Sequence, residues 1–477
     1  MGMGTLCDSG KVFPPLLHSS LEVLSQKISS PPFTASALEV SLSQFPPSRL
    51  LSLLASRSLF RSAIPPFPTT IKIQKTMSFQ DPSMEDLPVP LMVEILSRLP
   101  VKTIIHCKCV CKKWLNLVSD SYFANLHLSR SPASLIIHHT SKNEMAEGSF
   151  MPGILKLVEV EDEPDHHHLH HDPSMSLDLN LAPIFQKSKT FMAGSVDGLI
   201  CVLQYYPRAE SDKSYICNPI TREYVIIPNQ QYYKEENYLT INYGFGIGLV
   251  TKEYKVVRTI VGDKPSSLLE AEVYTLGSGQ WRRLGHVPYW INGFNGPFLN
   301  GHAHWTGSRS DSGSGSGSGS GSDEKICVFD FDEETFKSFP SPPEDIEESR
   351  SHFQTLGVLK GCLCRCDIEG RQGSLSKLVL WVMKEYGIKK SWCKELVIER
   401  SIDRNLDGPF SEAVYVIGGL KDGSILMACY PHTLFVYCPR RKRIVDTDLF
   451  DRYRWGLSYR PSFHRLHNFQ NERVHVF

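Results

Sequence analysis

The chain has 477 residues with 51 acidic and 51 basic side chains, so its formal net charge is +0. Such a balance creates no global field that would attract nucleic acid or an anionic membrane, and no apolar run is long enough to span a bilayer. The length suggests about two or three domains. The 13 cysteines show no disulfide or zinc spacing and follow no secretory signal, so we expect a reducing compartment, the cytoplasm or the nucleus.

The first part of the chain, residues 1–76, is rich in Ser, Leu and Pro and poor in acidic residues. That composition resembles a plastid transit peptide. The alternatives are a disordered extension, or a gene model that begins upstream of a true start at Met77. We favour these alternatives and expect residues 1–80 to contribute no folded domain.

Three short helical patterns come next. Pro88 and Pro90 suit a helix entry, where a missing N–H costs nothing, and Pro100 would end that helix. A second apolar segment starts at Ile104, and a third apolar face lies further on. A unit this small buries too little surface to be stable alone, so we expect a partner to cover part of it. The first face comprises Met92, Ile95, Leu96 and Leu99, and the third comprises Cys111, Trp114, Leu115 and Val118.

Residues 84–130 resemble an F-box. The resemblance rests on residues 87–88, 96–102, 110–114 and 117–120. It departs at Val89-Pro90, where acidic residues are usual, and at His106-Cys107, where Arg-Phe is common. The alternative is an ordinary helical hairpin with an aromatic anchor. The resemblance implies docking of a Skp-type adaptor, and through it a cullin and a RING subunit. The residues implied for adaptor binding are Leu87, Pro88, Ile95, Leu96, Leu99, Pro100, Val110, Cys111 and Trp114.

Residues 131–190 are predicted to be a linker that contains the first strands. Residues 135–139 have the pattern of a strand, and residues 159–172 are acidic and then His-rich. A His-rich tract can bind metal, but this one lacks Cys or Asp partners, so we predict a solvated loop and no metal site. Residues 177–183 resemble short plant repression motifs, whereas their alternation is also that of a half-buried strand, which we favour.

From Phe191 to the end, short strands and turns repeat at spacings of about 45 residues or fewer, with recurring aromatic residues. This pattern is typical of propeller blades, and the length leaves room for about six. Residues 378–398 read as a hairpin in which Trp381 and Trp392 flank the turn, and at least one of them should be buried. The Gly-Ser run within residues 306–323 is too polar to pack and is expected to be a flexible surface insertion. We therefore predict an α+β protein with a small three-helix unit and a mainly-β, six-bladed propeller over residues 191–477.

This second half resembles the plant F-box-associated domain, a kelch-related propeller. The segments that carry the resemblance are residues 217–223, 244–246, 254–257, 273–276, 300–305, 329–336 and 381–392. One departure is Cys393, where Thr is usual. The resemblance implies a substrate-recognition subunit of an SCF-type cullin–RING ubiquitin ligase, with the propeller holding an unknown target protein. The alternatives are a co-repressor scaffold that uses Leu177–Leu181, or a stand-alone ligand-binding propeller.

Apparent chemical sites in the sequence are better explained as core. The thiol-rich residues 107–111 belong to a helical pattern, and His302 and His304 flank a strand without a Cys or carboxylate at ligand spacing. No nucleophile elbow or P-loop occurs. We therefore expect a non-catalytic protein with no cofactor and no metal.

Propellers bind partners through the loops at the ends of the ring. Aromatic residues in three such segments are candidate target contacts, provided that they gather on the face away from the F-box. The alternative is that they pack between blades. The candidates are Tyr232, Tyr233, Tyr289, Trp290, Phe294 and Tyr430.

Overall fold

The computed structural model describes the protein from residue 87 onward, with gaps. The described residues are 87–132, 134–139, 154–158, 176–179, 189–205, 213–228, 238–262, 269–293, 295–309, 325–343, 351–369, 377–399, 413–420, 423–429, 433–446, 453–469 and 471–477. The expectations for residues 1–80, for the His-rich tract and for most of the Gly-Ser run lie outside these residues. The chain divides into two compact units, residues 1–99 and residues 100–477, so the division falls inside the predicted F-box.

The predicted helices are present. In the first unit, α4 (Val89–Leu96) has a proline in its first turn and buries Met92, Val93 and Leu96. In the second unit, α5 (Val101–Cys107) and α6 (Lys112–Val118) are followed by α7 (Ser121–Arg130). The Asp120 carboxylate caps α7 by accepting the Tyr122 N–H at 2.8 Å.

One helical face differs from the prediction. On α6 the buried residues are Trp114, Leu117 and Val118, whereas Leu115 is 41% exposed. The spacing of three and four residues from Trp114 selects both Leu117 and Val118, and so the buried face of this short helix runs through them. Leu115 was assigned to the wrong face.

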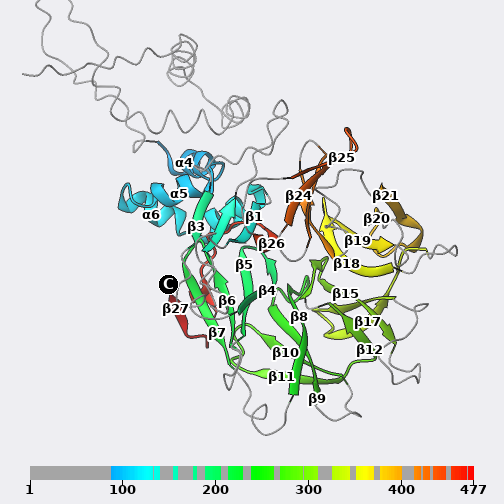
Figure 1. The fold of residues 1–477 in the computed structure, drawn as a ribbon. Helices are drawn as coiled ribbons and strands as arrows, with labels where there is room; N and C mark the ends of the chain where they lie inside the picture. The colour runs from blue at the N-terminus through cyan, green and yellow to red at the C-terminus, as the bar shows by residue number, and fades with distance from the viewer. Residues whose placement is uncertain are drawn as a thin grey trace, which may run out of the picture. The chain divides into compact units, whose positions relative to one another are not determined.

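The described strands form six sheets, which are arranged as blades around a ring (Figure 1). Each of the blades has an inner strand near the ring axis and outer strands away from it. Blade 2 contains β4 (Lys189–Val196), β5 (Leu199–Tyr205), β6 (Lys213–Asn218), β7 (Glu223–Ile227) and β27 (Val474–Val476). Blade 3 contains β8 (Tyr238–Ile247), β9 (Tyr254–Gly262), β10 (Glu270–Thr275), β11 (Trp281–His286) and β13 (Asn295–Gly296).

The next blades follow in chain order. Blade 4 contains β12 (Tyr289–Asn292), β14 (Phe298–Leu299), β15 (His302–Arg309), β16 (Lys325–Asp330) and β17 (Thr335–Phe339). Blade 5 contains β18 (Ser351–Leu359), β19 (Cys362–Glu369), β20 (Lys377–Met383) and β21 (Trp392–Glu399). Blade 6 contains β22 (Val414–Gly419), β23 (Ile425–Cys429), β24 (Thr433–Cys438) and β25 (Arg443–Asp446). The hairpin predicted over residues 378–398 is β20–β21, and both Trp381 and Trp392 are buried.

Blade 1 closes the ring. It consists of β26 (Tyr453–Tyr459), β1 (Ser134–His139), β2 (Ile154–Val158) and β3 (Ser176–Leu179), with Ser134 opposite Tyr459. The strands predicted to lie in a linker before residue 191 therefore belong to the propeller. The propeller therefore starts at β1 in the sequence. The inner strand of its first blade, β26, comes from the C-terminal part of the chain and pairs with β1.

Short hairpin turns define one end of the ring, which we call the turn face. Asp197-Gly198 and Asn300-Gly301 have positive φ at both residues, 49° and 85° in the first pair and 49° and 77° in the second, as two-residue hairpin turns require. The turn at Gly198 lies next to the end of β26, because the Tyr459 hydroxyl donates to the Gly198 carbonyl at 3.0 Å. The inner strands of all six blades begin at the opposite end, which we call the loop face.

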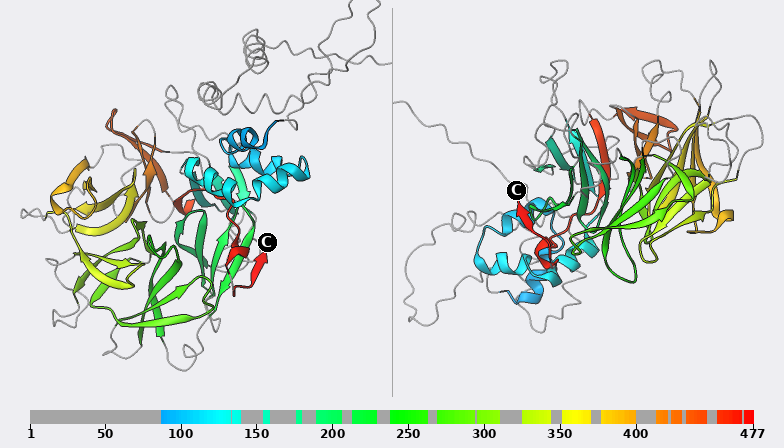
Figure 2. Two further views of the ribbon diagram at one scale, coloured as in Figure 1. Left: turned by 180° about the vertical axis from the view of Figure 1, so that it is seen from behind. Right: turned by 90° about the horizontal axis from the view of Figure 1, so that it is seen from below.

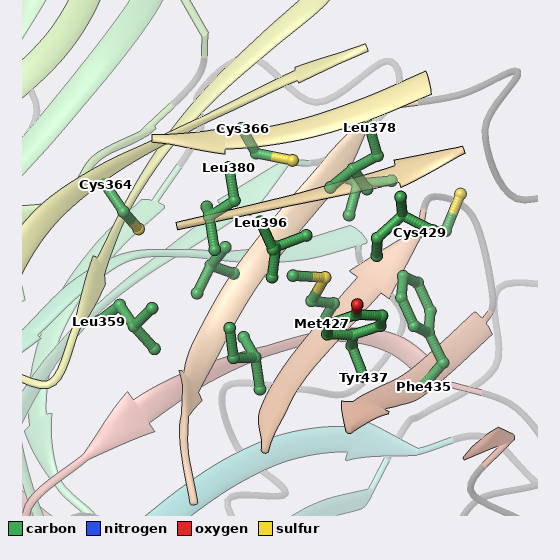
Figure 3. Close-up of a cluster of buried hydrophobic side chains, with 14 of the residues drawn as sticks. Leu359, Cys364, Cys366, Leu378, Leu380, Leu396, Met427, Cys429, Phe435 and Tyr437 are labelled. Atoms are coloured by element: carbon green, nitrogen blue, oxygen red, sulfur yellow. The ribbon is translucent and has the colours of Figure 1, made fainter. Parts of the chain in front are cut away.

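The core lies between neighbouring blades. Between blades 5 and 6, Leu378, Leu380 and Leu396 face Met427 and Phe435 (Figure 3). The same tryptophan hydrogen bond occurs twice in the outer strands. The Trp281 indole N–H donates to the Pro228 carbonyl at 2.8 Å, and the Trp392 indole N–H donates to the Pro340 carbonyl at 3.0 Å. In each case the first residue of an outer strand is linked to the end of the preceding blade.

Candidate functional site

In the first unit, the predicted adaptor-binding residues differ in exposure. Pro88 is exposed, and Leu87 and Ile95 are half-buried. Leu96 and Leu99 are buried. The exposed and half-buried residues are therefore available to a partner, whereas Leu96 at the end of α4 and Leu99 just after it pack into the interior.

In the second unit, the F-box helices leave apolar side chains in solvent. Trp114 is buried, Pro100 and Cys111 are half-buried, and Val110 is 45% exposed. Leu115 and Tyr122, at 41% and 66% exposed, were not among the predicted adaptor contacts. The exposure of Leu115 and Tyr122 depends on which face of each helix packs inward. The sequence pattern did not reveal that face for these two residues. An apolar surface of this kind on a small helical unit is typical of a partner-binding surface.

Helix α7 packs against the segment that follows β26. The Phe463 ring lies 6.0 Å from the Phe123 ring and 5.0 Å from the His127 ring, both in edge-on geometry. Burial lowers the pKa of His127 to about 4, so its imidazole is neutral at physiological pH. Both views in Figure 2 place α5–α7 beside the C-terminal segment.

We call residues 460–477 the C-terminal strap. The Asn218 side chain donates to the Ser462 carbonyl at 3.0 Å and to the His464 carbonyl at 2.7 Å. The buried Glu223 carboxylate accepts the Leu466 N–H at 2.6 Å and pairs with the Arg465 guanidinium at 2.9 Å. These contacts attach the first half of the strap to blade 2.

The second half of the strap joins blades 2 and 3. The Glu472 carboxylate accepts the Gly277 N–H at 2.7 Å and the Tyr274 hydroxyl. Strand β27 then pairs with β7, and the Tyr224 ring stacks on His475, 5.1 Å between centroids. The strap thus links α7 to two blades on the turn face.

The predicted target contacts Tyr289 and Trp290 differ in exposure. Tyr289 and Trp290 do not lie in a loop, as predicted, but in strand β12, which pairs with β15. Tyr289 is buried between blades 3 and 4, so it is a core residue, as the alternative interpretation proposed. Trp290 is 44% exposed. The strand alternates between core and solvent, and the loop prediction failed because four residues are too few to show that alternation.

The remaining candidates, Tyr232, Tyr233, Phe294 and Tyr430, lie outside the described residues. The strands that flank residues 232–233 and residue 430 end on the loop face: β7 ends and β8 begins there, and β23 ends and β24 begins there. Residue 294 instead comes between β12 and β13, and β13 pairs with the middle of β8. The helices α5–α7 are joined to β1 at the turn face. The ring therefore separates the helices from the face at which the strands flanking residues 232–233 and residue 430 end.

The histidines near strand β15 are structural. The His304 ring is buried, with Nδ1 3.1 Å from the Pro297 carbonyl and Nε2 2.9 Å from the Tyr386 hydroxyl. Burial lowers its pKa to about 3. Burial also raises the pKa of the Cys364 thiol to about 12, which disfavours the reactive thiolate.

In the described part of the chain no three His, Cys, Asp or Glu side chains group as a metal site, and no described helix is long and apolar enough to cross a membrane.

Comparison with known protein families identifies both domains of the chain. The model of the F-box associated beta propeller domain matches residues 159–462, and the model of the F-box domain matches residues 84–126. The chain belongs to the F-box associated beta propeller family. This confirms both resemblances, and the protein is an F-box protein with a six-bladed propeller.

Two similar plant proteins are F-box proteins by name. The chain is 27% identical to "F-box protein At3g07870" of Arabidopsis thaliana over 76% of this chain and 87% of that protein. It is 26% identical to "F-box/kelch-repeat protein At3g23880" of the same plant, over 73% of this chain and 89% of that protein. Among solved structures, a lectin of Aleuria aurantia is 8% identical with a TM-score of 0.33, covering 66% of this chain and 96% of that chain, too distant to bear on function.

Proposed function

We propose that this F-box protein is the substrate receptor of an SCF-type cullin–RING ubiquitin ligase. The F-box would dock a Skp-type adaptor, which brings the cullin and RING subunits, and the propeller would hold a target protein. The observation that carries the proposal is the exposed apolar surface of Val110, in the turn between α5 and α6, and of Leu115 and Tyr122 on α6 and α7. Such a receptor acts by proximity, because linking two binding modules raises the effective concentration of the target.

The same role accounts for the expected absence of catalytic chemistry and for a cytoplasmic or nuclear location, where such ligases operate. The co-repressor alternative has weaker support. Strand β3 pairs with β2, with Leu177 opposite Leu157 and Leu179 opposite Leu155. The leucine alternation of this segment is thus accounted for by a strand of blade 1.

The proposal is tested by co-purification of the full chain with a Skp-type adaptor. We expect Leu87→Ala combined with Pro88→Ala, and separately Leu115→Asp, to reduce adaptor binding at least tenfold, because each removes or charges apolar contact area. Ile388→Asp introduces the same charge at an exposed apolar residue of blade 5 and should leave binding unchanged. Wild-type chain that fails to bind the adaptor, or equal binding by all variants, would refute the proposal.

A further inference from the structure

A hairpin turn of blade 6 carries consecutive positive charges. Residues 439–442 join β24 to β25, because Cys438 is paired with Arg443 across the hairpin. The Arg441 N–H donates to the Cys438 carbonyl at 3.2 Å, so the backbone of the turn is held by the strands that it joins. Three neighbouring side chains of this turn are exposed cations, and we call them the basic turn: Arg440, Arg441 and Lys442.

The basic turn lies on the turn face of the ring. In the register of blade 6, Tyr437 is opposite Ile425, and Ile425 is opposite Gly419 at the end of β22. Because β22 begins at the loop face, these residues mark the other end of the blade. A fourth cation is close to the same end: the exposed Lys360, from the β18–β19 turn, packs so closely on Gly419 that a Cβ there would be 2.8 Å from the lysine Cε.

The positive charge at this end of blade 6 needs a source of carboxylates. Asp446, the acidic residue nearest to the basic turn in the sequence, is opposite Phe435 and so lies toward the loop-face end of β24. The β22–β23 turn contains Lys421 and Asp422, whose charges cancel. Fixed cations grouped in this way attract a segment of the opposite sign.

An acidic stretch of the chain is attached to the turn face of the neighbouring blade. It follows β2 directly, and the last residue of β2, Val158, is opposite Leu135 at the start of β1 and opposite Ser176 at the start of β3. Since β1 begins at the turn face, the β2–β3 connection both leaves and rejoins blade 1 there. By sequence, its first residues include five acidic ones: Glu159, Glu161, Asp162, Glu163 and Asp165.

The acidic stretch and the basic turn are attached to blades that share a core. Val158 belongs to the same hydrophobic cluster as Leu426 and Val436 of blade 6, and Val436 lies in β24 just before the basic turn. Stacked sheets pack about 10 Å apart, whereas eight residues of extended chain span about 25 Å. The acidic stretch is therefore long enough to reach the basic turn while both blades stay in place.

We propose that the basic turn and Lys360 form a docking surface for the chain's own acidic stretch, residues 159–165. The surface offers four cations to five carboxylates that are attached one blade away. A short tether keeps the local concentration of the acidic stretch at about the millimolar level, which favours it over an acidic segment of another protein. The docked stretch covers the boundary of blades 1 and 6 on the turn face, and it keeps other acidic molecules from the basic turn.

Zero-length cross-linking of the full chain tests the contact, because a carbodiimide joins a carboxylate to a lysine amine only where the two groups touch. We expect amide links from residues 159–165 to Lys442 and Lys360, found by mass spectrometry in monomeric protein. Raising the salt concentration from about 0.01 M to 1 M shortens the Debye length from about 30 Å to 3 Å and should lower the yield at least threefold. Arg440→Ala combined with Arg441→Ala keeps both lysines and should also lower it at least threefold.

Lysines on other blades provide the matched control. Lys252 and Lys390 are exposed in turn-face hairpins of blades 3 and 5, each two blades away from blade 1, and should give few links to the acidic stretch. A charge exchange checks that the contact is specific. Lys442→Glu should remove its link, and combining it with Asp162→Lys and Glu163→Lys should restore a link between the exchanged positions.

Three results would overturn the inference. The first is the absence of links between residues 159–165 and the basic turn at low salt. The second is an equal yield at Lys442, Lys252 and Lys390, which would mean that the acidic stretch has no preferred surface. The third is links that join two copies of the chain instead of residues within one. None of these measurements requires the adaptor, so their outcome is independent of the proposed function.

Discussion

His127 is a titratable residue buried where α7 meets the strap. Its ring is 5.0 Å from Phe463 and 6.2 Å from Phe123, and burial lowers its pKa from 6.5 to about 4. Between these two values the unfolded chain binds a proton that the folded chain does not. This residue therefore makes the folded state less stable as the pH falls from about 6.5 toward 4.

We expect the His127 contribution to the free energy of unfolding to fall by about 2 kcal/mol between pH 7 and pH 5, since each pKa unit is worth about 1.4 kcal/mol. His127→Phe keeps a ring between Phe123 and Phe463 and cannot titrate. Denaturant unfolding of both proteins across this pH range measures the difference, which removes the effect of other buried histidines such as His304. An equal pH slope in the two proteins would contradict the assignment.

Trp392 combines packing with a hydrogen bond to the preceding blade. Trp392→Ala should lower the free energy of unfolding by about 3–5 kcal/mol, because a large buried ring is lost. Trp392→Phe keeps most of the apolar area and loses the bond to the Pro340 carbonyl, so its cost should be about 1 kcal/mol. Urea denaturation of both variants separates the two contributions. Equal costs would show that the hydrogen bond, and not the packing, dominates.

At the scale of elements, the C-terminal strap contacts helix α7 through the ring of Phe463. Phe463→Ala removes the ring that touches both Phe123 and His127. We expect amide hydrogen exchange in residues 121–130 to rise at least tenfold while exchange in blades 5 and 6 stays unchanged, because the ring contacts of Phe463 are with α7.

Phe469→Ala provides the matched control for this prediction. Phe469 lies on the same strap but its ring contacts Tyr254 of blade 3, 5.8 Å between centroids. It should leave exchange in α7 unchanged. If both variants loosen α7 equally, the strap transmits any local damage and Phe463 has no special role.

At the scale of the whole molecule, ring closure joins the two ends of the propeller. Ending the chain at residue 452 removes β26, so β1 becomes an exposed inner edge and blade 1 loses the strand that pairs along its length. Exposed strand edges promote aggregation. We expect this truncation to be insoluble or unfolded in light-scattering and circular dichroism measurements.

Ending the chain at residue 469 tests a milder change. It removes β27 and the Glu472 contacts but leaves β26 in place. This variant should fold, with a lower melting temperature than the full chain. Folding of both truncations to the same extent would show that closure by β26 is dispensable.

The amino-acid sequence by itself determined the local features of the protein. The helix of residues 89–96 follows from its apolar spacing and from the prolines on either side. The hairpin of residues 378–398 follows from two apolar strands separated by a short turn, and the number of blades follows from how often such units recur. These features depend on neighbours a few residues away, and so their signals lie within short segments.

Only the tertiary structure decided which distant segments meet. The sequence did not indicate that β1–β3 belong to the ring, because their inner strand, β26, comes from the other end of the chain. It also did not separate Tyr289, which is buried against blade 3, from its neighbour Trp290, which is exposed. The physical reason is the same in both cases: strand pairing between chain ends and packing between blades are non-local, so a residue's exposure is set by a neighbour that its own segment does not encode.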